Sequence, residues 1–127
     1  MRRLIVDGMN VIGSRPDGWW QDRDGAVRRL VESLHRLADG TGAEITVVLD
    51  GRPLADLPEG LHGPVMVHYA ARKGPDAADD RIVQLIDADL DPAALEVVTA
   101  DSRLRARVTR LGAGVSGPRA LLDELSA

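Results

Sequence analysis

The 127-residue sequence contains no cysteine, which excludes disulfides, thiolate zinc sites and cysteine nucleophiles. Aromatic residues make up only 2% and phenylalanine is absent, so valine, leucine, isoleucine and alanine must form the core. The longest apolar runs are about five residues, far below the roughly 20 that span a bilayer. A secretory signal would show a cationic segment followed by an apolar stretch, and the sequence has no such pattern. We therefore expect a cytoplasmic protein without a membrane partner.

Lysine and glutamate are also scarce. The 16 basic residues are 15 arginines and Lys73, and the 20 acidic residues are 15 aspartates and 5 glutamates. The arginine excess is typical of a GC-rich genome, whereas the aspartate excess suggests hard cations, which prefer carboxylate oxygens. A net charge of −4 argues against a protein that coats nucleic acid through bulk charge. It leaves room for a local basic patch.

Apolar periodicity predicts a single domain, residues 1–127, in which strands alternate with helices. The strands are expected over 3–7, 44–50, 65–71, 95–99 and 114–116, and the helices over 25–39, 76–89, 102–111 and 118–125. A turn should follow Asp7, and residues 51–64 should form a Pro/Gly-rich loop. Such alternation indicates right-handed βαβ crossovers. The expected fold is α/β, a three-layer α/β/α sandwich around a parallel sheet of about five strands.

Aspartates collect where the predicted strands end. Asp7, Asp50 and Asp101 each follow an apolar run. Any one of them is unremarkable, because aspartate is common in turns and helix caps. Parallel strands, however, bring their carboxyl ends to one edge of the sheet, where ligands of such folds bind. The joint occurrence therefore favours a functional site at that edge.

A further acidic group opens the predicted helix that begins at Asp76. At 100° per residue, Asp79 lies in the middle of the apolar face, with Asp76 and Asp80 on its flank. Burying an unpaired carboxylate costs several kcal/mol, so a cation or a proton should neutralise it. Magnesium or manganese is the natural counter-charge. Such ions generate hydroxide from water and stabilise phosphodiester cleavage, which makes phosphoryl hydrolysis the expected chemistry.

Three motifs together resemble the NYN domain, particularly its YacP-like branch among the PIN-like nucleases. They are Asp7-Gly8-Met9-Asn10-Val11-Ile12, Ala78-Asp79-Asp80-Arg81-Ile82-Val83 and Thr99-Ala100-Asp101-Ser102, followed by the closing segment Gly112-Ala113-Gly114-Val115-Ser116. The similarity covers essentially the whole chain. It implies a PIN-like fold and a metal-dependent endoribonuclease that uses one or two magnesium or manganese ions and a metal-activated water.

The resemblance also implies which residues form the site. The catalytic residues would be Asp7, Asn10, Asp79, Asp80 and Asp101, with the four aspartates as metal ligands. Asn10 would orient Asp7, or contact a metal-bound water or a phosphate. Accessory positions would be Asp24, Asp76, Thr99 and Ser102. One departure concerns metal binding: related nucleases often carry another acid one helical turn after the last motif aspartate, where this sequence has Arg105.

Basic residues that would hold RNA are expected near these acids. Arg103, Arg107 and Arg110 fall within about 60° of one another on one helical face, and arginine suits phosphate binding. Arg72 and Lys73 precede the helix of Asp79 and would grip the RNA beside it. A solvated helix face and an ordinary chain turn are the structural alternatives. Trp19 and Trp20 either stack on bases or pack the entrance to the first helix.

Two other functions remain open at the sequence level. One is an RNA-binding or ribosome-associated module that keeps the fold but has weak or no turnover, which the replacement at Arg105 allows. The other is a phospho-receiver domain, which is similar in length and also binds magnesium. A receiver needs a phospho-accepting aspartate after its third strand and a lysine after its fifth, and neither is present here.

Overall fold

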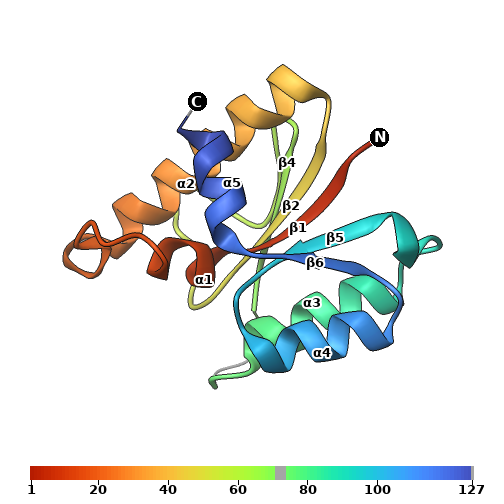
Figure 1. Ribbon diagram of the computed structural model, residues 1–127. Coiled ribbons are helices and arrows are strands. Elements are labelled where there is room, and N and C mark those ends of the chain that lie inside the picture. Colours follow the sequence, from red (N-terminus) through yellow and green to blue (C-terminus); the bar gives the residue numbers. More distant parts are fainter. Residues whose placement is uncertain (71–73, 127) are drawn as a thin grey trace.

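In the computed structural model, which describes residues 1–70 and 74–126, the strands form one twisted sheet in the order β3-β4-β2-β1-β5-β6 (Figure 1). Their bounds are β1 Arg3–Asp7, β2 Glu44–Leu49, β3 Gly60–His62, β4 Val65–Tyr69, β5 Leu95–Val98 and β6 Gly114–Ser116. Neighbouring strands are parallel except β3 and β4. The predicted α/β sandwich is therefore confirmed, with one antiparallel edge strand added.

Helices cover both faces of the sheet. They are α1 Gly8–Gly13, α2 Arg23–Thr41, α3 Ala77–Asp87, α4 Ser102–Arg110 and α5 Pro118–Leu125, with short 3-10 turns η1 Trp19–Gln21 and η2 Pro92–Ala94. Figure 1 shows α1, α2 and α5 on one face, and α3 beside α4 on the other. In the part of the chain that the structure describes, no helix is long and apolar enough to cross a membrane.

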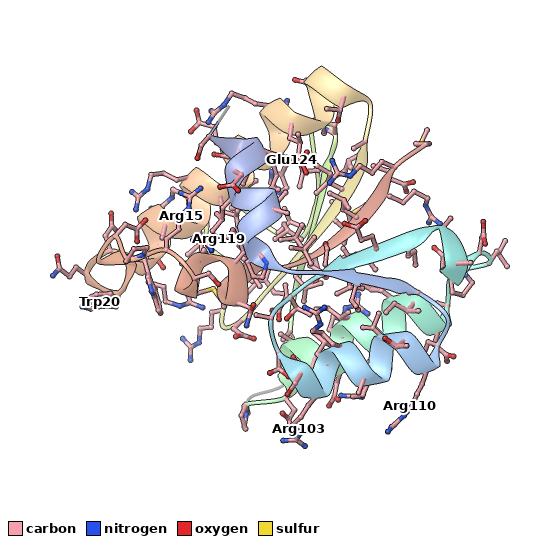
Figure 2. The ribbon with its side chains drawn as sticks, viewed as in Figure 1. Arg15, Trp20, Arg103, Arg110, Arg119 and Glu124 are labelled. Carbon is pink, nitrogen blue, oxygen red and sulfur yellow. The ribbon has the colours of Figure 1, made fainter. Side chains whose placement is uncertain are left out.

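Two aliphatic cores lie between these layers. Along β1 the side chains alternate: Leu4 and Val6 pack toward α1 and α2, whereas Ile5 packs toward α3 and α4. Such strands are apolar on both faces because helices cover both faces. The near absence of aromatic residues is thus compatible with a fully packed sandwich. Trp19 packs against the first core, whereas Trp20 is 64% exposed and projects from the outer end of that layer (Figure 2).

The prediction of a turn after Asp7 is wrong, because the helix α1 begins at Gly8, directly at the end of β1. A Cβ atom on Gly8 would lie 2.6 Å from the Leu49 side chain and 2.9 Å from the carbonyl oxygen of Val48. Only glycine lets the chain leave β1 this close to β2. A six-residue helix is too short for its periodicity to be visible in the sequence.

The loop expected over 51–64 contains β3, which pairs antiparallel with β4 at the edge of the sheet. Three residues are too few to show strand alternation, and Leu61 on this strand is 66% exposed. The side chain of Glu59 reinforces the pairing, since its Oε1 accepts a hydrogen bond from the Tyr69 N–H at 2.9 Å. Backbone pairing rather than burial therefore creates this strand.

Candidate active site

Asp7 ends the central strand β1 and is only 6% exposed. Because β2 and β5 flank it on either side, its carboxylate is removed from water at the carboxyl edge of the sheet. Its Oδ2 accepts a hydrogen bond of 2.8 Å from the Thr99 hydroxyl, and Thr99 is itself fully buried. Among the described residues, Asp7 and Thr99 are the polar or charged side chains that are buried, and they satisfy each other through this hydrogen bond.

Short hydrogen bonds connect Asp7 to the loop after β5. The Thr99 hydroxyl also accepts from the Asp101 N–H at 3.1 Å, and Asn10 Oδ1 accepts from the Ala100 N–H at 2.8 Å. Asn10 therefore bonds the loop carrying Asp101 and orients that loop rather than Asp7. Asp101 Oδ1 in turn accepts from the Leu104 N–H at 3.0 Å and caps α4. The first and third motifs are thus joined.

The acids of this edge repel one another. Burial raises the pKa of Asp7 to about 6; the bond from Thr99 opposes this rise, and the charges of Asp79, Asp50 and Asp101 add to it. Burial also raises the pKa of Asp79, with further contributions from the charges of Asp101 and Asp76. An excess of negative charge therefore collects at one point, which favours a cation there.

Asp50, the strand-end aspartate of β2, belongs with Asp7, Asp79 and Asp101 to one acidic group, because its charge raises the pKa of both Asp7 and Asp79. Burial raises the pKa of Asp50, and the charge of Arg23 opposes that rise. Arg23 also donates to the backbone carbonyl of Asp50 at 2.9 Å and fixes the start of α2 against the end of β2. The next residue, Asp24, is exposed at the first turn of α2.

Asp80 and Arg107 form an ion pair between α3 and α4, with 2.9 Å between Oδ1 and the guanidinium nitrogen. Arg107 was expected to bind RNA, and it faces the acids closely enough for its charge to lower the pKa of Asp79. Arg105, which departs from the expected acidic pattern, donates to the Thr99 carbonyl oxygen at 3.3 Å. These two arginines partly offset the acidic charge.

The remaining expected residues are spread along the edge and beyond it. Asp76 precedes α3 and Ser102 opens α4, and both are exposed. Figure 2 shows Arg103 and Arg110 projecting into solvent from opposite ends of α4. The predicted arginine stripe therefore extends away from the acids as it runs along the helix. Arg72 and Lys73 lie outside the described residues.

Sequence reasoning missed a second polar group beside the acids. The Arg81 guanidinium lies 3.1 Å from His68 Nδ1 and 3.4 Å from Gln84 Oε1. Arg81 and Arg107 line one cavity of about 700 Å³ between β4, α3 and α4. The i,i+3 spacing of Arg81 and Gln84 was available in the sequence, but the neighbouring strand that supplies His68 was not.

The donors at this edge suit a hard divalent cation. Within residues 1–70 and 74–126, no three His, Asp or Glu side chains are arranged to enclose a metal ion. Magnesium does not require such a cage, because it keeps several waters and is commonly held by one or two carboxylates. The oxygen donors of Asp7, Asp79 and Asp101, together with their mutual repulsion, therefore fit a hydrated ion of this class.

Known proteins resemble this chain along its length. One crystal structure of Rae1 (YacP) from Bacillus subtilis is 27% identical to this chain, with a TM-score of 0.77, and the match covers 99% of this chain and 74% of that one. A crystal structure of a mutant form of that protein is 26% identical, with a TM-score of 0.78, and the match covers 99% of this chain and 76% of that one. UPF0178 proteins from Xanthomonas oryzae and Xanthomonas campestris are 36% identical over 109 and 104 residues, or 83% and 79% of this chain.

The chain spans 59% and 56% of the length of these two UPF0178 relatives. A family model, the YacP-like NYN domain, matches residues 4–127 and so includes every motif described above. The sheet order, the buried Asp7 and the hydrogen-bonded loop at Asp101 lie within that match. The chain therefore belongs to the YacP-like NYN domain family and has the PIN-like fold of Rae1 (YacP).

Proposed function

We propose that this domain is a divalent-metal-dependent endoribonuclease that hydrolyses RNA phosphodiester bonds. The observation that carries the proposal is the buried Asp7 carboxylate, whose pKa is raised to about 6 beside the charges of Asp79, Asp50 and Asp101. Perturbed carboxylates cluster at functional sites, and repulsion among them is relieved by a cation. Membership of the NYN family supports a nuclease over other magnesium-binding proteins.

Asp7, Asp79, Asp80 and Asp101 are the residues that would hold magnesium or manganese. The chemistry supplied by such an ion is activation of water and stabilisation of the attacking and leaving oxygens. The protein's own contribution is positioning: Thr99 holds Asp7, and Asn10 holds the loop that carries Asp101. Arg107 neutralises part of the charge on α3, which limits repulsion of an incoming phosphate.

The second candidate is an RNA-binding or ribosome-associated module of the same fold with little turnover. Arg105 favours it, because a cation stands where relatives have an acid and contacts the loop of the site. A phospho-receiver is disfavoured, since β4, the third parallel strand along the chain, ends at Tyr69 and is followed by Ala70. Neither residue accepts phosphate in the manner of an aspartate.

The test incubates purified protein with end-labelled structured RNA in manganese, in magnesium or in EDTA, beside Asp7→Asn and Asp101→Asn variants. We expect cleavage that requires the ion and is reduced at least about a hundredfold in both variants. The exposed loop variant Asp17→Asn is the matched control and should cleave normally. Cleavage indifferent to EDTA, or to both substitutions, would contradict the proposal. RNA that is bound but never cut would support the binding module instead.

A further inference from the structure

The cavity of about 700 Å³ between β4, α3 and α4 lies next to the acidic group, and of the four proposed ion-binding aspartates it shares Asp80. Asp80 lines it, and the preceding residue, Asp79, belongs to the acidic group. Its volume lies within the roughly 300–1,000 Å³ that small-molecule sites occupy. A strand of RNA crossing the acids would therefore place an adjoining nucleotide at this hollow.

Among the residues that the structure describes, two arginines line the cavity, and their surroundings differ. Arg107 forms the ion pair with Asp80, whereas Arg81 is held by His68 Nδ1 and Gln84 Oε1. Burial and the charge of Arg81 lower the pKa of His68, so the imidazole is a neutral acceptor at pH 7. Among residues 1–70 and 74–126, no carboxylate lies within ion-pair distance of Arg81. Its positive charge remains available to an anion.

The other walls determine how a nucleotide would lie. Val83 and Ala77 provide apolar surface, and Gln84 provides an amide beside Arg81. Glu59 lies on the wall formed with β4, where its carboxylate repels a phosphate. A phosphate group therefore belongs at the arginines, and the base belongs against the apolar wall, within reach of the Gln84 amide.

We infer that this cavity is a nucleotide subsite, in which Arg81 and Arg107 bind a phosphate of the RNA and the wall formed by Val83 and Gln84 receives the attached base. The inference deepens the proposed function and rests on it for the identity of the polymer. Arginine suits the role because its planar guanidinium can form two parallel hydrogen bonds with phosphate oxygens. Arg81 is pre-oriented by its contact with His68, which reduces the entropy lost on binding.

The experiment follows nuclear magnetic resonance shifts of the Arg81 Nε–H and Gln84 side-chain amide while nucleoside 5′-monophosphates are added to the full chain. EDTA is present throughout, so that no divalent ion bridges the phosphate to the acids. We expect saturable shifts and a Kd that Arg81→Gln weakens at least about tenfold. Arg119→Gln, on exposed α5 and labelled in Figure 2, is the matched control and should bind as the wild type does.

Inorganic phosphate and the unphosphorylated nucleosides separate the two halves of the subsite. The inference requires the monophosphate to bind more tightly than either of them. If inorganic phosphate binds as tightly as the monophosphate, the cavity is only an anion site and the inference is overturned. Unchanged binding in Arg81→Gln would also overturn it. So would the absence of any shift at a monophosphate concentration of about 10 mM, because a Kd weaker than that is too weak for a substrate subsite. The amide spectrum of each variant reports whether it is folded.

The cleavage assay keeps this inference separate from the proposed function. If the enzyme is active, Arg81→Gln should raise KM for RNA at least about fivefold while kcat changes less than twofold, because the subsite binds substrate rather than the reacting atoms. A chain that binds monophosphates through Arg81 but cleaves no RNA would overturn only the proposed function. If Asp7→Asn abolishes cleavage but Arg81→Gln leaves monophosphate binding unchanged, only the subsite would be overturned.

Discussion

Asp7 is the residue at which function and stability conflict most directly. Its carboxylate is nearly inaccessible to water and lies among other negative charges, so its ionised form destabilises the folded state. A folded-state pKa of about 6, against an ordinary 3.8, means that the folded protein holds the proton more tightly than the unfolded chain does. The contribution of this group to stability is therefore greatest at low pH and is lost as pH rises through 6.

Replacing Asp7 by Asn should stabilise the protein while abolishing activity. The gain in the free energy of unfolding over wild type should be small below pH 4. It should grow to at most about 3 kcal/mol above pH 6.5, since each unit of the pKa difference corresponds to about 1.4 kcal/mol. Urea denaturation at several pH values measures this difference. Asp17→Asn, in an exposed loop, should show no such trend. A variant less stable than wild type at pH 7.5 would contradict the assignment.

Thr99 is fully buried and bonds the Asp7 carboxylate, so we expect it to act as a positioning residue. Thr99→Val keeps the shape but removes the hydroxyl that donates to Asp7 and accepts from Asp101. The hydrogen bond lowers the pKa of Asp7, so its loss should shift the acid side of the pH–rate profile to higher pH. Stability should also fall by about 1–3 kcal/mol. Thr99→Ser should restore the profile; an unshifted profile for Thr99→Val would argue against this role.

At the scale of an element, α4 combines structural and functional roles in its first residues. Asp101 caps the helix through the Leu104 N–H and also belongs to the acidic group. A single substitution to alanine confounds the two roles. Serine at this position can cap a helix as aspartate does, but it carries no charge.

Asp101→Ser and Asp101→Ala should therefore separate the roles. Both variants should lose cleavage by at least about a hundredfold, whereas only Asp101→Ala should lose about 1 kcal/mol of stability. Thermal denaturation followed by circular dichroism, together with the RNA cleavage assay, measures the two effects. Substantial activity in Asp101→Ser would show that capping, rather than charge, is the contribution of this residue.

At the scale of the whole molecule, the sheet holds like charges together that an unfolded chain would separate. Ion binding at Asp7, Asp79 and Asp101 should relieve that repulsion and stabilise the folded state. At an ion concentration a hundred times its Kd, the gain is about 2.7 kcal/mol. Such a gain should raise Tm by roughly 8–15 °C in a domain of this size.

A magnesium or manganese titration followed by differential scanning calorimetry tests this expectation. The wild type should show a saturable rise in Tm, and Asp7→Asn and Asp101→Asn should show less than half of it. Sodium chloride at matched ionic strength controls for screening, which acts on all surface charges alike. An equal rise in all these proteins would place the ion elsewhere.

Much of this molecule was predictable because its signals are local. The buried strands 3–7, 44–49 and 95–98 are apolar runs, and α2 carries a stripe that repeats at helical spacing. Asp79 was recognisable because a carboxylate stood on an apolar face. Parallel topology then directed the strand-end acids to one edge. By contrast, α1 and β3 are too short to have a period and depend on close approach and backbone pairing.

The sequence by itself determined the order of the longer helices and strands, the apolar character of those strands and the acids at their ends, since each depends on neighbouring residues. Only the tertiary structure decided which groups share an environment: Asn10 bonds the loop of Asp101, Arg107 pairs with Asp80, and Arg81 meets His68 beside a cavity. These contacts join residues from different elements. Their partners follow from strand order and helix packing, which no local pattern encodes.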